Sequence, residues 1–113
     1  MQPAALIKQE LVAAEAAWNE GNEGKARVCA RRAVGLSTKE WLEHHPVRRW
    51  RGDAMEHLRQ IQQDASFPLS IRQAAQRLST TVNRQQTAPF TTDPIGDAKL
   101  IIAHLAPTLQ SEC

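Results

Sequence analysis

The sequence is poor in the residues that build β-sheets and disulfide frameworks. It contains no tyrosine, three tryptophans, two phenylalanines and few β-branched residues, so we expect no sheet. Two cysteines are too few for a disulfide framework, and Cys29 is expected to be a small buried thiol. No apolar run approaches the ~18 residues of a membrane span, and the first residues lack a secretory signal pattern. These absences predict a cytoplasmic protein without membrane association.

Motifs for several kinds of chemistry are also missing. The chain has no glycine-rich phosphate loop, no Gly-x-Ser-x-Gly nucleophile motif, and no zinc-type spacing of cysteines or histidines. The neighbouring His44 and His45 would diverge by ~100° on a helix, so they do not converge on one metal ion. We therefore predict neither a metal nor a cofactor.

What the sequence does contain is helical periodicity. At 113 residues and 42% hydrophobic content, the chain is expected to form one domain over residues 1–113, with a structured core over 3–106 and a flexible tail over 107–113. Apolar or small residues recur every three or four positions in five segments. These are Ile7, Leu11, Ala14 and Trp18; Ala26, Ala30, Ala33 and Ser37; Ala54, Leu58, Ile61 and Ala65; Ile71, Ala74, Leu78 and Val82; and Ile95, Ala98, Ile102 and Leu105. The pattern predicts an all-α, up-and-down bundle of four to five helices.

The second segment leaves its helix boundaries open. Its alanine positions suit close approach of another backbone, which predicts a central helix running from Asn22 or Glu23 toward His44. Gly35 can end a helix, however, and Ser37 and Glu40 fit a capping box, so two shorter helices are the alternative. Continuity of the pattern through Trp41 favours one long helix.

Other boundaries are marked by capping residues. Asp53 is a candidate N-cap for the third helix, which otherwise begins near Val47, and Ser70 is a candidate N-cap for the fourth. Asp93 followed by Pro94 is typical of the start of a fifth helix. Residues 83–92 have no periodicity and are predicted to form a loop.

Positive charge is concentrated in residues 25–51. Eight lysines and arginines stand there against two glutamates, a net charge of +6 within a chain of net charge +2. Such a region can attract nucleic acid or an acidic partner, or it can be the solvated side of amphipathic helices, on which Arg31, Arg32 and Lys39 would stay in water. The candidate binding residues are Arg31, Arg32, Arg48, Arg49, Trp50 and Arg51. Trp50 among arginines offers a stacking ring for single-stranded nucleic acid, or caps the bundle with arginines over its faces.

Several of these segments resemble a known family. Leu11 to Ala14, Gly21, and the alanines of residues 26–33 are similar to the opening helical hairpin of HEPN domains and of the substrate-binding partners of small nucleotidyltransferases. Glu56, His57 and Leu58 resemble the family's His-Leu pair on the third helix, and residues 93–102 resemble its last helix.

The resemblance implies a helical bundle that commonly dimerises. Some members are metal-independent ribonucleases with an Arg-x(4–6)-His pair, and Arg51 with His57 has that spacing. In the family the pair usually precedes the last helix, where this chain has Arg84 without a histidine within seven residues. The alternative is that His57 is a polar residue at the edge of the core and Arg51 pairs with Asp53 or Glu56.

Taken together, the sequence predicts a non-enzymatic binding or interaction module, acting through a partner protein or as a homodimer. Two alternatives stay open. One is a metal-independent ribonuclease built on Arg51 and His57, and the other is a non-specific nucleic-acid binder using the basic residues 25–51.

Overall fold

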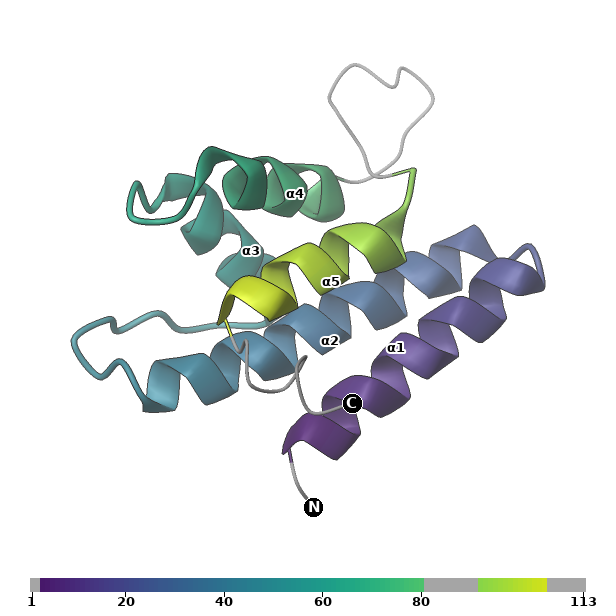
Figure 1. The fold of residues 1–113 in the computed structure, drawn as a ribbon, viewed down its shortest axis with the longest axis horizontal. Coiled ribbons are helices and arrows are strands. Elements are labelled where there is room, and N and C mark those ends of the chain that lie inside the picture. The colour runs from purple at the N-terminus through teal and green to yellow at the C-terminus, as the bar shows by residue number, and fades with distance from the viewer. Residues whose placement is uncertain (1–2, 81–91, 106–113) are drawn as a thin grey trace.

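A computed structural model describes residues 3–80 and 92–105, and these residues form five α-helices and no strand (Figure 1). The helices are α1 (Pro3–Asn19), α2 (Glu23–Glu43), α3 (Ala54–Gln63), α4 (Leu69–Ser79) and α5 (Pro94–Leu105). The predicted all-α bundle is therefore confirmed. Most of the predicted loop 83–92, together with Val82 and the predicted tail 107–113, lies outside the described residues.

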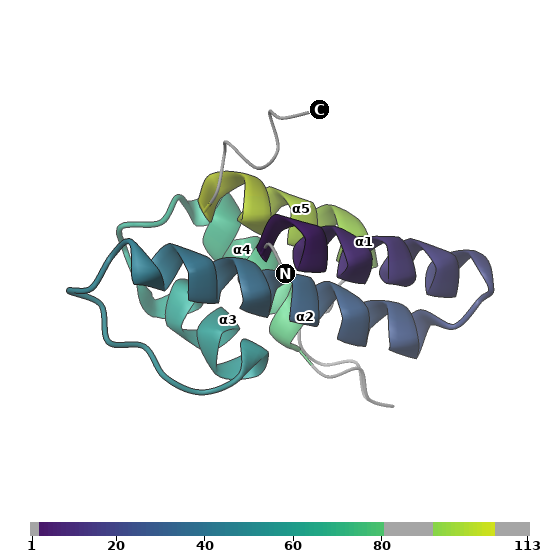
Figure 2. The ribbon, with the colours of Figure 1, turned by 90° about the horizontal axis from the view of Figure 1, so that it is seen from below.

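The longest helix, α2, is the centre of the arrangement. It forms an antiparallel hairpin with α1 and also packs against α5 and α3 (Figures 1 and 2). The remaining helix, α4, packs against both α3 and α5. The chain runs in the same direction along α5 as along α2 (Figure 1). The prediction of a central, tightly packed second helix is confirmed.

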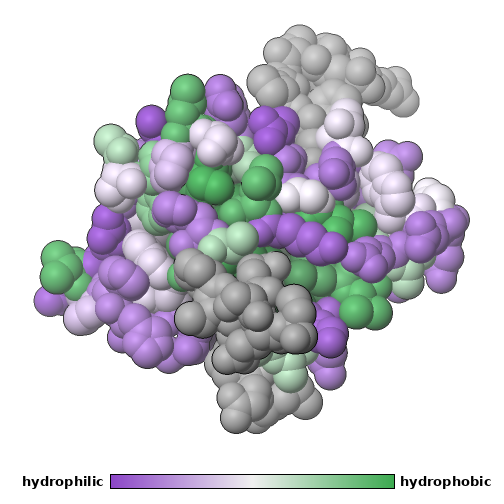
Figure 3. Space-filling model, in the orientation of Figure 1, coloured by the Kyte–Doolittle hydropathy of each residue, from purple (hydrophilic) through white to green (hydrophobic). Residues whose placement is uncertain are grey.

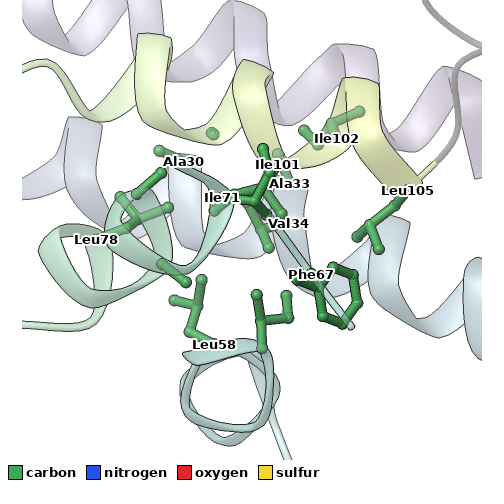
Figure 4. Close-up of a cluster of buried hydrophobic side chains, with 14 of the residues drawn as sticks. Ala30, Ala33, Val34, Leu58, Phe67, Ile71, Leu78, Ile101, Ile102 and Leu105 are labelled. Atoms are coloured by element: carbon green, nitrogen blue, oxygen red, sulfur yellow. The ribbon is translucent and has the colours of Figure 1, made fainter. Parts of the chain in front are cut away.

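One core joins all five helices. Its members are Ile7 from α1; Ala30, Ala33 and Val34 from α2; Leu58 and Ile61 from α3; Phe67; Ile71, Ala74, Ala75 and Leu78 from α4; and Ala98, Ile101, Ile102 and Leu105 from α5. Figure 4 shows how side chains from α2, α4 and α5 meet those of α3 and Phe67. Cys29 is buried as predicted, at 4% exposed.

The buried face of α1 differs slightly from the predicted one. Ile7 and Ala14 are buried as predicted, but Ala17 is buried with them, whereas Leu11 and Trp18 are only half-buried. The alanines of α2 let the two backbones approach closely, so a small residue fits between the helices better than the large ring of Trp18.

Side-chain caps start three of the helices. Asn22 Oδ1 accepts from the Lys25 amide at 3.1 Å, and Asp53 Oδ1 accepts from the Glu56 amide at 3.1 Å. Asp93 Oδ1 accepts from the Gly96 amide at 3.0 Å, and α5 begins at Pro94, the residue after Asp93. The predicted N-caps at Asp53 and Asp93 are therefore confirmed.

Two predicted boundaries of α3 and α4 are wrong. Ser70 does not cap α4, because the helix already begins at Leu69 after Pro68, whose carbonyl accepts from the amides of Ile71 and Arg72. Ala65 is exposed and lies beyond α3, because Asp64 turns the chain by accepting hydrogen bonds from Ser66.

The ion pair between α4 and α5 was not predicted. Asp97 is 7% exposed, and its two carboxylate oxygens accept from Arg77 at 2.8 and 3.2 Å. Asp97 lies in the first turn of α5, where a carboxylate interacts favourably with the helix dipole, and the bidentate pair adds a link between two helices.

Gly35 does not break α2, which is one helix from Glu23 to Glu43. The hydroxyl of Thr38 donates back to the Val34 carbonyl at 2.7 Å, as a residue inside a helix does. The role of Gly35 is steric: a Cβ at this position would lie 2.7 Å from the Cβ of Ala54, the first residue of α3. The missing side chain therefore lets the start of α3 rest directly on α2.

This contact predicts the effect of a single methyl group. Gly35→Ala gains about 1 kcal/mol of helix propensity but overpacks against Ala54 by about 1–3 kcal/mol, so we expect a net loss of unfolding free energy. Gly24→Ala is the matched control, because a Cβ there meets nothing within 4 Å and should stabilise α2.

Urea denaturation of the two variants measures the difference. Adding Ala54→Gly to Gly35→Ala should recover much of the lost stability. A Gly35→Ala protein as stable as Gly24→Ala would contradict the close contact.

Candidate functional site

The connection between α2 and α3, residues 44–53, holds four of the six candidate binding residues. It extends past the end of the bundle before returning to the start of α3 (Figures 1 and 2). The chain re-enters α3 through Gly52, whose φ of +103° favours glycine, and a Cβ there would lie 2.8 Å from the Glu56 side chain.

Arg48 anchors this loop to the turn after α3. Its Nε donates to Asp64 Oδ2 at 3.0 Å, an Nη donates to Ser66 Oγ at 2.8 Å, and its guanidinium lies 5.1 Å from the centre of the Trp41 ring. Hydrogen bonds from Ser66, and then from Arg48, lower the pKa of the Asp64 carboxyl to about 2. Arg48 therefore anchors the loop, and its positive charge is paired with the carboxylate of Asp64.

Aromatic rings hold the same loop from the core side. The rings of Trp50 and Phe67 lie 5.5 Å from Trp41, measured between centroids, and 6.0 Å from each other. His45 stacks on Trp41 at 4.2 Å. Trp50 is partly buried against the core, which agrees with the prediction that it caps the bundle, although the arginine that covers a ring is Arg48 over Trp41.

Arg31 is not the solvent-facing residue that the sequence predicted. It is half-buried, and its Nε donates to the Leu78 carbonyl at 2.7 Å while an Nη reaches the Thr80 carbonyl at 3.4 Å. A helix leaves its last carbonyls without partners, and a guanidinium from a neighbouring helix satisfies them here. Arg31 therefore fastens the end of α4 to α2.

Four exposed cations lie on the loop or line the groove described below: Arg49 and Arg51 on the loop, and Arg32 and Lys39 on α2. We call them the basic face. None of them makes a hydrogen bond or ion pair with another described residue, whereas the nearby Glu40 and Asp64 are engaged with His44 and Arg48.

Arg32 and Lys39 line a groove of about 300 Å³ on α2. They are seven positions apart, so they lie on one side of the helix, with Gly35 and Leu36 between them. The groove is also lined by the last two loop residues, Gly52 and Asp53, and by Ala54, the first residue of α3. Glu10 of α1 and His57 complete the lining.

His57 is 7% exposed, and its Nδ1 is buried without a hydrogen-bond partner among the described residues. Burial lowers the pKa of its imidazole, against a smaller opposing effect of Asp53, so the ring is neutral at neutral pH. Arg51 is exposed and does not line the groove. Within residues 3–80 and 92–105, no hydrogen bond or ion pair joins Arg51 to His57, Asp53 or Glu56.

A second hollow, of about 350 Å³, lies beside Trp50. Its other lining residues are Gln60, Gln63, Asp64 and Ala65. Sequence reasoning missed the two glutamines. Their spacing of three on a helix indicates a shared face, but only the path of the loop along α3 brings Trp50 beside them.

Comparison with known protein families, curated proteins and solved structures finds no match for this chain. Within the described residues, no helix is long and apolar enough to span a bilayer. The same residues bring no three His, Cys, Asp or Glu side chains together at a spacing that suits a metal ion.

The Asp64 network predicts how stability depends on pH. Because the folded-state pKa of Asp64 lies below its usual 3.8, the ionised carboxylate stabilises the fold above about pH 4, and this contribution disappears as the pH falls toward 2. Asp64→Asn should lower the unfolding free energy at pH 7 by about 1 kcal/mol, since the pair with Arg48 is partly exposed to solvent.

Urea denaturation between pH 2 and pH 7 compares the two proteins. The stability curves should converge at the acidic end. Parallel curves over the whole range would show that Asp64 does not carry this pH dependence.

Proposed function

We propose that the chain is a non-enzymatic binding module and that its basic face contacts single-stranded nucleic acid. The observation that carries this proposal is the set of four exposed cations, Arg32, Lys39, Arg49 and Arg51, without acidic partners among the described residues. Lysines and arginines that neutralise phosphates supply most non-specific affinity for nucleic acid by releasing counterions.

The arrangement of the loop supports the same proposal. Arg49 and Arg51 are the chain neighbours of Trp50, so two exposed cations and an aromatic ring occur on the same short loop. Single-stranded nucleic acid is commonly held by such a combination of cations and stacking rings. Arg48 and the aromatic contacts fix this loop before any ligand arrives, which lowers the entropic cost of binding.

The groove adds two more cations to this surface. Arg51 directly precedes Gly52, which lines the groove, so the loop cations adjoin Arg32 and Lys39. Two carboxylates, Glu10 and Asp53, also line the groove, and Asp53 is engaged in capping α3. Because the groove carries both signs of charge, it is better suited to be part of an open surface along which a polyanion lies than to be a closed pocket for a single phosphate.

The geometry favours binding over catalysis. A ribonuclease of the Arg-x(4–6)-His kind needs the histidine and the arginine at the same phosphate. Here His57 is buried and neutral, and Arg51 lies on the exposed loop. The resemblance to HEPN domains and the homodimer remain predictions.

Replacing Arg49 and Arg51 together by glutamine should weaken binding of a fluorescein-labelled 12-nucleotide oligo(U) about tenfold at low salt. It should also reduce the slope of log K against log salt by about 1.4, because each lost phosphate contact on a single strand accounts for about 0.7. Fluorescence anisotropy at 25–200 mM salt measures both quantities.

Lys25→Gln is the matched control. This exposed lysine lies about 28 Å along α2 from the loop, by helical rise. It should leave the slope almost unchanged. Unaltered binding of oligo(U) by the Arg49/Arg51 variant would contradict the proposal. Binding of a poly-glutamate peptide but not of oligo(U) would also contradict it and would favour an acidic protein partner.

The binding module should not cut its ligand. End-labelled RNA incubated with the wild-type protein and with His57→Gln should stay intact in both reactions on a denaturing gel. Cleavage by the wild type that the His57 substitution abolishes would establish the ribonuclease alternative instead.

A further inference from the structure

We propose that the hollow beside Trp50 holds one unstacked base of the bound strand, with Trp50 as its stacking surface and Gln60 and Gln63 as its hydrogen-bonding groups. This inference rests on the proposed function, and it assigns base recognition to residues that the basic face does not include.

Trp50 is held in place by neighbouring rings. It packs against Trp41 and Phe67 toward the core, yet it also lines the hollow. A ring that is already packed loses little conformational freedom when a base stacks on it. Stacking of a base on an aromatic side chain is sequence-tolerant because every base has a π-face.

The glutamines supply hydrogen-bonding groups beside the ring. Gln60 and Gln63 are three residues apart on α3 and both line the hollow. Neither side-chain amide makes a hydrogen bond to another described residue, in contrast to Gln62, which donates to Ser79 at 2.7 Å. A primary amide offers both a donor and an acceptor, which matches the edge of a nucleobase.

Asp64 also lines the hollow, and its carboxylate does not compete for the base. One of its oxygens accepts from Arg48 and the other accepts from Ser66, so the carboxylate is satisfied within the protein. The hollow has a volume of about 350 Å³ and is open to solvent, so a base of a passing strand can enter it from the surface.

The position of the hollow suits a strand held by the basic face. Arg49 and Arg51 are the chain neighbours of Trp50, so the exposed cations of the loop lie on the same segment as the ring that lines the hollow. The base pocket and the phosphate contacts therefore belong to one binding surface, with separate chemical roles.

Two kinds of labelled 12-mer separate these roles: oligo(U), oligo(C) and oligo(A), which carry bases, and an abasic ribose-phosphate strand, which does not. The wild type should bind at least one base-bearing strand five- to tenfold more tightly than the abasic strand at equal salt. Trp50→Ala should remove that difference, and Trp50→Phe should keep part of it.

Gln60→Ala/Gln63→Ala keeps the test independent of any effect of Trp50 on folding. It should make the affinities for U, C and A more alike and leave the abasic strand bound as before. Gln73→Ala/Gln76→Ala is the matched control, a pair with the same spacing on α4 at a hollow that no aromatic ring lines.

The outcomes distinguish the two proposals. If the abasic strand binds as tightly as every base-bearing strand, the base pocket is wrong while the basic face still stands. If the glutamine variant keeps the base preference of the wild type, the hydrogen-bonding role is wrong. If no strand binds, both proposals fail.

Discussion

The fold depends on how closely the neighbouring helices can pack against α2. Along α2, Ala26, Ala30 and Ala33 let α1 and the core pack tightly, and Gly35 lets the first residue of α3 touch the helix backbone. Because α3 starts at that contact, Gly35 also fixes where the groove lies and where the preceding loop must end. The candidate binding surface is thus a consequence of small side chains on α2.

A second constraint separates structural arginines from available ones. Arg31 and Arg48 satisfy backbone carbonyls, a carboxylate and a ring, so their charges belong to the fold. Arg32, Lys39, Arg49 and Arg51 lack such partners among the described residues. Exposed apolar side chains also occur outside this basic face and include Val12 on α1 and Leu100 on α5. Figure 3 shows hydrophobic residues over α1 and α5 on one face of the molecule.

Helical periodicity was enough to predict the fold class and the central helix, and the residue types at Asp53 and Asp93 were enough to predict two N-caps. These features depend on local sequence, where an N-cap side chain bonds to an amide three residues away. The ambiguity at Gly35 could not be resolved locally, because its explanation is Ala54, nineteen positions later. Ser70 and Ala65 were misassigned because Pro68 and Asp64 control the turns next to them.

The candidate site was harder to predict than the fold. Sequence alone grouped all arginines of residues 25–51 as one basic region, but their roles differ according to partners such as Leu78 and Asp64, which are distant in the sequence. Gln60 and Gln63 carried no motif at all. Their relevance comes from Trp50, which the loop places beside α3.

The most direct test of the account is a two-dimensional ¹⁵N–¹H NMR titration of the whole chain with oligo(U). The account predicts that chemical shifts change at the Trp50 indole, at the side-chain amides of Gln60 and Gln63, and at backbone amides of residues 49–54. Changes confined to α1 and α5, or none at ligand excess, would contradict it.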